Sequence, residues 1–247
     1  MAYSFGAPSI VQDGLVLYYD SANPNSCTST SAGDKIFDLS DITYITGSNP
    51  NNTGSFEGTV TKTAGNLAFD FNELGDNISI PNFMDPLSDD SKFPNGNNNP
   101  NITLSCWVNN TNLNSGDNSL MWIGNQTARG VHAMCTNSTR YSFLHYGNGS
   151  DAVFTDYTIP AATWQHVVMT YNTTGRVNQL YVDGDLIQTI SNKPEDSDIN
   201  IVFPDLNLIG NYRNSKLGFA ACFMIYNRVI TASEVNQNYN ALKGRFV

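Results

Sequence analysis

Apolar and polar residues alternate along much of this chain, and the pattern is clearest between Thr163 and Gln188. Residues 167–171, Val-Val-Met-Thr-Tyr, show the period of two that is typical of a β-strand. Asn172-Thr173-Thr174-Gly175 then interrupts the run with residues that favour turns. Leu180-Tyr181-Val182 is a second strand pattern. The Asp183-Gly184 dipeptide after it favours a type I′ turn, because both central residues of that turn need a positive φ. The segment predicts a tight antiparallel meander, and it contains no pattern of catalytic residues.

Strand patterns of the same kind recur along the chain, separated by turns rich in Gly, Asn and Pro. They occupy residues 15–20, 65–71, 77–81, 102–108, 119–123, 131–135, 141–146, 152–158, 206–210 and 219–226. One helix is predicted near the end, because Thr231-Ala232-Ser233-Glu234 matches a capping box. Val235, Tyr239 and Leu242 have the spacing of one apolar helix face, and Gly244 is expected to end the helix. The chain is therefore predicted to be all-β with one short C-terminal helix.

The composition agrees with a β-rich globular protein. The 247 residues include 33 Asn and 19 Gly, while charged residues make up only 14% of the chain. That balance suits a β-protein with long turns. No internal repeat, heptad pattern or low-complexity linker divides the sequence, and a chain of this length can bury one full core. We therefore predict a single domain over residues 14–247, preceded by an N-terminal arm over residues 1–13.

Charge and cysteine placement narrow the class of protein. The formal net charge is −10 and the few basic residues are scattered, so we expect no nucleic-acid partner and no anionic membrane surface as a partner. No apolar run is long enough to span a membrane, and the first residues lack the basic and apolar regions of a signal peptide. Cys27, Cys106, Cys135 and Cys222 have no metal-binding spacing. Cys106 and Cys222 lie inside apolar strand patterns, so we expect them to be buried free thiols. The four cysteines together favour a protein that is made in a reducing cytoplasm.

Six blocks of sequence, taken in order, resemble the concanavalin A-like lectin/glucanase superfamily in its laminin-G-like branch. The blocks are residues 14–24, 37–40, 67–81, 102–108, 163–188 and 208–241. In the meander the resemblance rests on the pattern W-x-H-V-V-x-T-Y followed by L-Y-V-D-G-x-L. The resemblance covers about residues 14–246. It implies a two-sheet antiparallel jelly-roll sandwich in which the N- and C-terminal strands are adjacent.

Two segments also resemble domains of structural proteins from tailed bacteriophages. They are the L-Y-Y-D-x-A-N-P motif at residues 17–24 and the N-Y-N-A-L-K-G-R-F motif at residues 238–246. The resemblance implies a virion protein, namely a capsid decoration protein, a head fibre or a tail-fibre module, with other virion proteins as partners. Attachment to a virion also favours a symmetric homo-oligomer.

The superfamily includes glucanases, in which paired carboxylates in an E-x-D-x-x-E pattern act on the glycosidic bond. This chain has four Glu residues, namely Glu57, Glu73, Glu195 and Glu234. None occurs in that pattern, and Glu234 is explained as part of the capping box. The three histidines are interpreted as side chains on strand faces, with His166 packed and hydrogen-bonded; the other two are His132 and His145. We therefore predict no catalytic residues and no enzyme activity.

Many laminin-G-like proteins bind calcium through loops at one edge of the sandwich. The resemblance would place such ligands at Gly124-Asn125-Gln126-Thr127 and at Asn211-Tyr212-Arg213-Asn214. These segments offer amides and a cation where a divalent ion needs anionic oxygens, so no cofactor and no metal ligand are predicted, and calcium is left as an alternative. Asp70, Asn72 and Asp76 are a second candidate set, which a β-turn explains equally well.

Amides, carboxylates and flat aromatic side chains on loops or on a concave sheet are the groups that hold sugars. The chain offers six side chains for such a site, namely Asn125, Arg129, Tyr146, Asn148, Tyr212 and Arg213. The general abundance of Asn and Tyr explains them as well. The leading interpretation is a non-enzymatic virion structural protein that also contacts host-surface polysaccharide. The alternatives are a carbohydrate-binding adhesin domain outside a virion and a glycan-degrading enzyme.

Overall fold

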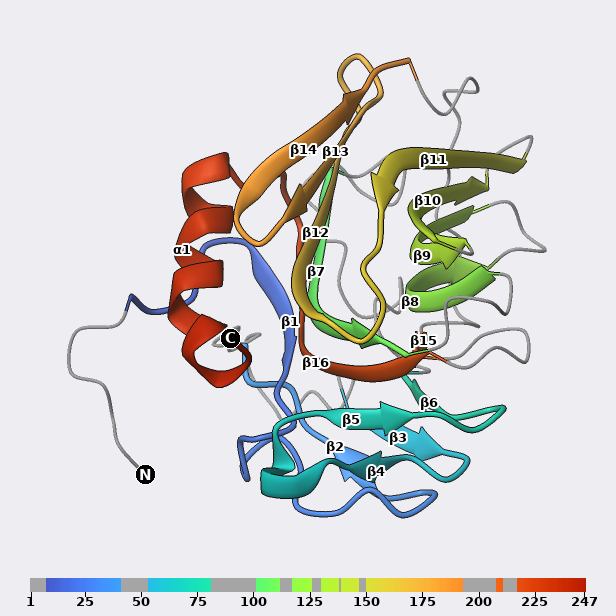
Figure 1. The fold of residues 1–247 in the computed structure, drawn as a ribbon, viewed down its shortest axis with the longest axis vertical. Helices are drawn as coiled ribbons and strands as arrows, with labels where there is room; N and C mark the ends of the chain where they lie inside the picture. The colour runs from blue at the N-terminus through green and yellow to red at the C-terminus, as the bar shows by residue number, and fades with distance from the viewer. Residues whose placement is uncertain are drawn as a thin grey trace, which may run out of the picture.

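The computed structural model describes residues 8–40, 53–80, 101–111, 117–125, 130–137, 139–146, 150–192, 208–210 and 217–247, and the structural statements below concern these residues. They form 16 strands, one α-helix and two short 3-10 turns. The strands are arranged in two sheets of eight strands each (Figure 1), and all the strand pairs are antiparallel. The predicted all-β jelly-roll sandwich with a short C-terminal helix is confirmed.

Sheet A brings the first and last strands of the chain together. Its order is β14 (Asp185–Ile190), β13 (Val177–Val182), β12 (Trp164–Asn172), β7 (Ile102–Asn110), β16 (Gly218–Tyr226), β5 (Phe69–Phe71) and β4 (Thr61–Lys62). Outside this path, β1 (Leu15–Tyr19) pairs with β16. The predicted adjacency of the terminal strands is therefore confirmed.

Sheet B combines a sequential meander with strands from distant parts of the chain. Its order is β11 (Ser150–Thr158), β10 (Arg140–Tyr146), β9 (Gly130–Asn137), β8 (Asp117–Asn125), β15 (Leu208–Gly210), β6 (Asn77–Ser79), β3 (Gly54–Glu57) and β2 (Lys35–Ile36). The late strand β15 lies between β8 and β6, so the early and middle parts of the chain are tied together by a segment near its end.

The main core lies between the sheets, because every second residue of a strand points to the same face. In β12 the inward residues Val167, Met169 and Tyr171 are buried in this core. Aromatic rings connect the two sheets directly: the rings of Phe56 in β3 and Phe69 in β5 have centroids 5.4 Å apart. This spacing matches the period of two from which the strand was predicted.

A second apolar cluster covers the outer face of sheet A, where the helix α1 (Ala232–Leu242) packs. Figure 1 shows α1 beside β1 and β14. Val168 of β12 and Trp107 of β7 point into this cluster and are fully buried. The Trp107 ring stacks on Phe246, with centroids 4.5 Å apart. Both faces of the central strands of sheet A are therefore covered, which explains why β12 is buried at every position from Gln165 to Tyr171.

Local signals in the sequence correspond to local structure. The predicted strands from residue 102 onward all occur, with ends shifted by a few residues. Asp183 and Gly184 have φ values of 54° and 92°, as the expected type I′ turn between β13 and β14 requires. The capping box is also present: the Thr231 side chain accepts the Glu234 N–H, and the Glu234 side chain accepts the Thr231 N–H. All four cysteines are buried free thiols, which confirms the expectation for Cys106 and Cys222.

The early part of the chain differs from the prediction. Three short strands, β2, β3 and β4, were not predicted, because two to four residues are too few to show a period. The strand expected to start at residue 65 starts at Phe69, since residues 64–66 form a 3-10 turn in which Gly65 has a φ of 78°. The sequence also predicts polar loops at residues 85–100 and 191–200; the first loop, and all of the second but residues 191–192, lie outside the described residues.

A bulge in β16 changes which residues face outward. The register of β16 against β7 shifts between Ala221 and Met224, and Cys222 has a φ of 54°. Ala221 and Cys222 consequently both join the outer cluster, although they are neighbours in the chain. An alternating pattern cannot indicate such an extra residue.

The described part of the predicted N-terminal arm, residues 8–13, packs on the helix and on β16. The Val11 N–H donates to Asn238 Oδ1 at 2.8 Å, and the Tyr226 hydroxyl donates to the Val11 carbonyl at 3.1 Å. The division into an arm at 1–13 and a domain at 14–247 stays a prediction. In the described residues, no helix has the length and apolar character needed to cross a membrane.

Candidate functional site

Two of the six predicted sugar-binding residues fall in described strands. Asn125 is the last residue of β8 and pairs with Gly130, while Tyr146 is the last residue of β10 and pairs with Val131. Gly130 and Val131 are neighbours at the start of β9. Asn125 and Tyr146 therefore lie at the same end of sheet B, where β8 and β10 both finish.

The other four predicted residues lie outside the described ranges, namely Arg129, Asn148, Tyr212 and Arg213. By sequence, the first two follow the strands β8 and β10, and the last two follow β15. Leu208 of β15 lies opposite Trp122, and the antiparallel register carries Gly210 toward the start of β8. The strand that precedes Tyr212 and Arg213 thus ends at the opposite end of sheet B from Asn125 and Tyr146. The six-residue site stays a prediction, and only Asn125 and Tyr146 are placed at a common edge.

A serine and a histidine meet on the outer face of sheet A. Ser105 Oγ in β7 lies 3.0 Å from His166 Nε2 in β12. The backbone N–H of His166 donates to Asp183 Oδ1 at 2.8 Å, whereas His166 Nδ1 is buried without a hydrogen-bond partner. In a Ser-His-Asp hydrolase the carboxylate accepts from Nδ1 and orients the ring. The three residue types are present here, but the carboxylate is bonded to the wrong atom for that chemistry.

Stacked rings also separate this pair from solvent. Trp107 lies on His166 with centroids 5.4 Å apart, and Tyr239 of α1 lies 6.2 Å from the His166 ring. Ser105 and His166 are fully buried. Burial lowers the pKa of His166 to about 3, so the ring is neutral near pH 7. The pair is a packed, structural hydrogen bond, as was expected for His166. Ser105 was not predicted as its partner, because a single strand pattern does not reveal cross-strand register.

The acidic residues considered for calcium are engaged in local structure. Asp76 is buried, and its carboxylate accepts the Thr59 N–H at 2.7 Å and the Glu73 N–H at 2.9 Å. Asp70 Oδ1 accepts a hydrogen bond from Asn72 Nδ2. Across the described ranges, no three His, Cys, Asp or Glu side chains are grouped as a metal site would require. Of the alternative calcium segments, residues 126–127 and 211–214 lie outside those ranges.

A model of the concanavalin A-like lectin/glucanases superfamily matches residues 85–236, which is more than half of the chain. The two-sheet antiparallel sandwich described above is the fold expected for that superfamily. The protein is therefore of the lectin-like β-sandwich class, and the chain belongs to the concanavalin A-like lectin/glucanases superfamily. None of the curated proteins matches it.

Solved structures with a similar fold include receptor-binding domains of botulinum neurotoxins. The serotype D binding domain has a TM-score of 0.65 at 16% identity, over 93% of this chain and 51% of that chain. The serotype D ligand binding domain in complex with N-acetylneuraminic acid has a TM-score of 0.60 at 17% identity, over 93% and 51%. The binding domain of neurotoxin DC in complex with rat synaptotagmin II has a TM-score of 0.62 at 17% identity, over 93% and 52%. The chain spans about half the length of these domains, and identities this low show similarity of fold alone.

Proposed function

We propose that this chain is a non-enzymatic, carbohydrate-binding structural protein of a tailed-bacteriophage virion. The observation that carries the binding role is a lectin-type sandwich in which β8 and β10 finish together at Asn125 and Tyr146. A rigid sheet that presents connections at one end is a common scaffold for ligand binding. Arg129 and Asn148 follow these strand ends, and Tyr212 and Arg213 are assigned to a second group after β15.

Two of the structural neighbours support a recognition role. One is described as a ligand binding domain in complex with N-acetylneuraminic acid, and another as a binding domain in complex with rat synaptotagmin II. Of these two ligand classes we favour a host-surface polysaccharide, because amides, arginines and tyrosines dominate the assigned residues. Other virion proteins are the second class of partner in this proposal.

Absence of catalysis is part of the proposal, and the burial of the serine-histidine pair supports it. Ser105 and His166 are covered by Trp107 and Tyr239, so this pair is closed to a substrate. Glu234, the only Glu in the C-terminal block, is bonded to Arg228 Nη2 at 2.6 Å and caps the helix. Neither group is free to act on a glycosidic bond.

The virion location rests on the resemblance of residues 17–24 and 238–246 to phage structural proteins. Capsid decoration, head-fibre and tail-fibre roles all agree with it, as does assembly in the host cytoplasm. Mass spectrometry of purified virions tests this location: the chain is expected among the particle proteins. Its absence from particles, with retention of glycan binding, would favour the alternative of an adhesin domain outside a virion.

A glycan array with the purified protein tests the binding role. We expect selective binding to host-type surface polysaccharide, weakened by Tyr146→Ala or Asn148→Ala. Phe37→Ala is the matched control, because Phe37 is 52% exposed and lies far from these strand ends in the chain. Binding to no glycan would contradict the proposal. Release of reducing sugar above a buffer blank would instead favour the glycan-degrading alternative.

A further inference from the structure

A continuous row of side chains crosses the outer face of sheet A, starting at the edge of the area that the C-terminal segment covers. Trp164 in β12 is directly opposite Asn109 in β7, and Asn109 is opposite Phe219 in β16. Phe219 is in turn opposite Asp70 in β5, which is opposite Thr61 in β4. Residues directly opposite one another in antiparallel strands point to the same face of a sheet. The five side chains therefore form one line across five adjacent strands.

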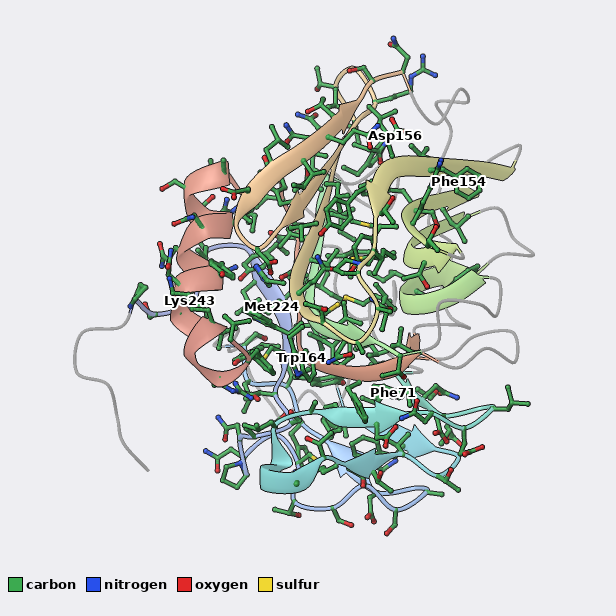
Figure 2. The ribbon with its side chains drawn as sticks, viewed as in Figure 1. Phe71, Phe154, Asp156, Trp164, Met224 and Lys243 are labelled. Carbon is green, nitrogen blue, oxygen red and sulfur yellow. The ribbon has the colours of Figure 1, made fainter. Side chains whose placement is uncertain are left out.

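The neighbouring residues confirm that this line faces outward. Phe69 and Phe71, on either side of Asp70, are buried in the core between the sheets, as is Ala220 next to Phe219. Trp164 and Phe219 instead pack against the outer cluster and remain partly exposed. Figure 2 shows Trp164 near the lower part of sheet A, close to β16. The row is thus reachable from solvent at its aromatic and polar positions.

The two aromatic side chains are held in fixed positions. The Trp164 ring rests against Phe246, with centroids 4.8 Å apart. Trp164 and Phe219 are separated by one intervening strand, which places their backbones roughly 10 Å apart at the usual strand spacing. Rings that are anchored on one side and open on the other lose little conformational entropy when a ligand stacks on them. They can serve as two platforms for successive sugar rings.

Asn109, between the two aromatics, has an amide oxygen without a hydrogen-bond partner. This Oδ1 atom is buried and finds no partner among the described residues. An unpartnered buried amide oxygen costs about 1–3 kcal/mol. A sugar hydroxyl can accept a hydrogen bond from Nδ2, or donate to Oδ1 after rotation of the amide. This residue is therefore suited to fix the position of a ring between the two platforms.

Asp70 supplies a fixed acceptor at the far side of Phe219. Its Oδ1 accepts from Asn72 Nδ2, and the Thr111 hydroxyl donates to Asn72 Oδ1 at 3.2 Å. This chain of hydrogen bonds orients the carboxylate, which is partly exposed and can accept a hydrogen bond from a ligand hydroxyl. Burial raises the pKa of Asp70 above its usual value. A carboxylate here, on a chain of net charge −10, disfavours an anionic ligand.

The geometry points to a carbohydrate-binding row on the outer face of sheet A, formed by Trp164, Asn109, Phe219 and Asp70, which takes neutral sugar chains. This inference rests on the proposed glycan binding, but it assigns the binding to different residues and narrows the ligand class. The row lies where β7 ends and β12 and β16 begin, whereas Asn125 and Tyr146 lie where β8 and β10 end. Acidic sugars such as N-acetylneuraminic acid are not expected to bind at this row.

Isothermal titration calorimetry on the full chain tests the assignment. The probes are neutral hexasaccharides of glucose, mannose and N-acetylglucosamine, with a sialylated oligosaccharide as the anionic comparison. We expect at least one neutral probe to bind more tightly than the sialylated one. Phe219→Ala and Asp70→Asn are each expected to weaken that binding about tenfold, which corresponds to about 1.4 kcal/mol. Asp70→Asn keeps the size of the side chain, so it remains informative if Phe219→Ala fails to fold.

Matched variants separate the two sites. Phe154→Ala removes another partly exposed aromatic ring, on β11, and Figure 2 shows Phe154 well away from Trp164. This variant should keep binding of the neutral probe within twofold. Binding that survives Phe219→Ala and Asp70→Asn but is lost in Tyr146→Ala or Arg213→Ala would overturn the row and leave the proposed function intact. Selective binding of the sialylated probe would also overturn it. Binding of neither neutral nor sialylated probes would overturn the proposed function and this inference together.

Discussion

At the scale of single residues, Asp20 and Arg245 join the two ends of the chain. Arg245 Nη2 donates to Asp20 Oδ1 at 2.8 Å and Arg245 Nη1 donates to Asp20 Oδ2 at 2.9 Å, across 225 positions of sequence. The Tyr18 hydroxyl donates to the same carboxylate at 3.0 Å. Asp20 belongs to the motif at residues 17–24 and Arg245 to the motif at residues 238–246. Their occurrence together therefore has a structural reason, independent of any partner.

Loss of this ion pair should destabilise the protein. Arg245→Met leaves the Asp20 carboxylate largely buried without its cation. We expect a loss of about 2 kcal/mol in the free energy of unfolding, which is less than the roughly 3–5 kcal/mol for a fully buried pair because part of Arg245 is exposed. Urea denaturation measures this loss. The double variant with Asp20→Asn should lose less than the sum of the single variants. Fully additive effects would show that the two side chains do not interact in solution.

His166 makes stability depend on pH. Its pKa is lowered by burial from 6.5 to about 3, so the unfolded chain takes up a proton near pH 6.5 while the folded ring stays neutral. The contribution of the neutral His166 ring to the free energy of unfolding is therefore complete above pH 6.5. It is lost progressively as the pH falls toward 3. We expect the free energy of unfolding to fall between pH 7 and 5.5, with a smaller fall in His166→Asn. Urea denaturation at pH 7 and at pH 5.5 measures the free energy of unfolding of both proteins. An equal fall in the original protein and in His166→Asn would contradict the assigned burial of His166.

At the scale of elements, the features that depend on neighbouring residues were predicted, and the features that depend on distant pairing partners were missed. The helix cap at Thr231 and Glu234 and the turn at Asp183-Gly184 depend on residues within four positions, and both were predicted. The strands β2, β3 and β4 were missed because their short segments are defined by their pairing partners. The bulge at Cys222 was missed for a related reason, since it is defined only by the register of β16 against β7.

The capping residue Glu234 should make the stability of the protein depend on pH in a second range, which is more acidic than the range for His166. Hydrogen bonds from Arg228, with those from Thr231, lower the pKa of Glu234 from 4.5 to about 2. This stabilisation is present above pH 4.5 and is lost as the pH falls from about 4.5 to about 2. We expect Glu234→Gln to lower the melting temperature at pH 5 and to have little further effect at pH 2. Glu57→Gln, at the exposed end of β3, is the control and should leave the melting temperature unchanged at pH 5.

At the scale of the whole molecule, the fold was predicted from the order of six sequence blocks, but the binding surfaces could be predicted only in part. Asn125 and Tyr146 were offered as sugar-binding groups by residue type, and the strand pairing places their backbones at one end of sheet B, but the six-residue site stays a prediction. The row of Trp164, Asn109, Phe219 and Asp70 was not predicted as a site. Its members come from four strands spread over the chain, and only the cross-strand register brings them into line. A register between distant strands leaves no pattern in a single sequence.

We propose that this lectin-like protein binds a carbohydrate and leaves it intact. Native mass spectrometry of the full chain, mixed with neutral and sialylated oligosaccharides, tests binding and the absence of cleavage in one measurement. We expect a complex whose mass equals the protein plus one or more intact oligosaccharides, with no shorter sugars formed on prolonged incubation. Unliganded protein with all of the oligosaccharides, or the appearance of cleaved sugars, would contradict the account.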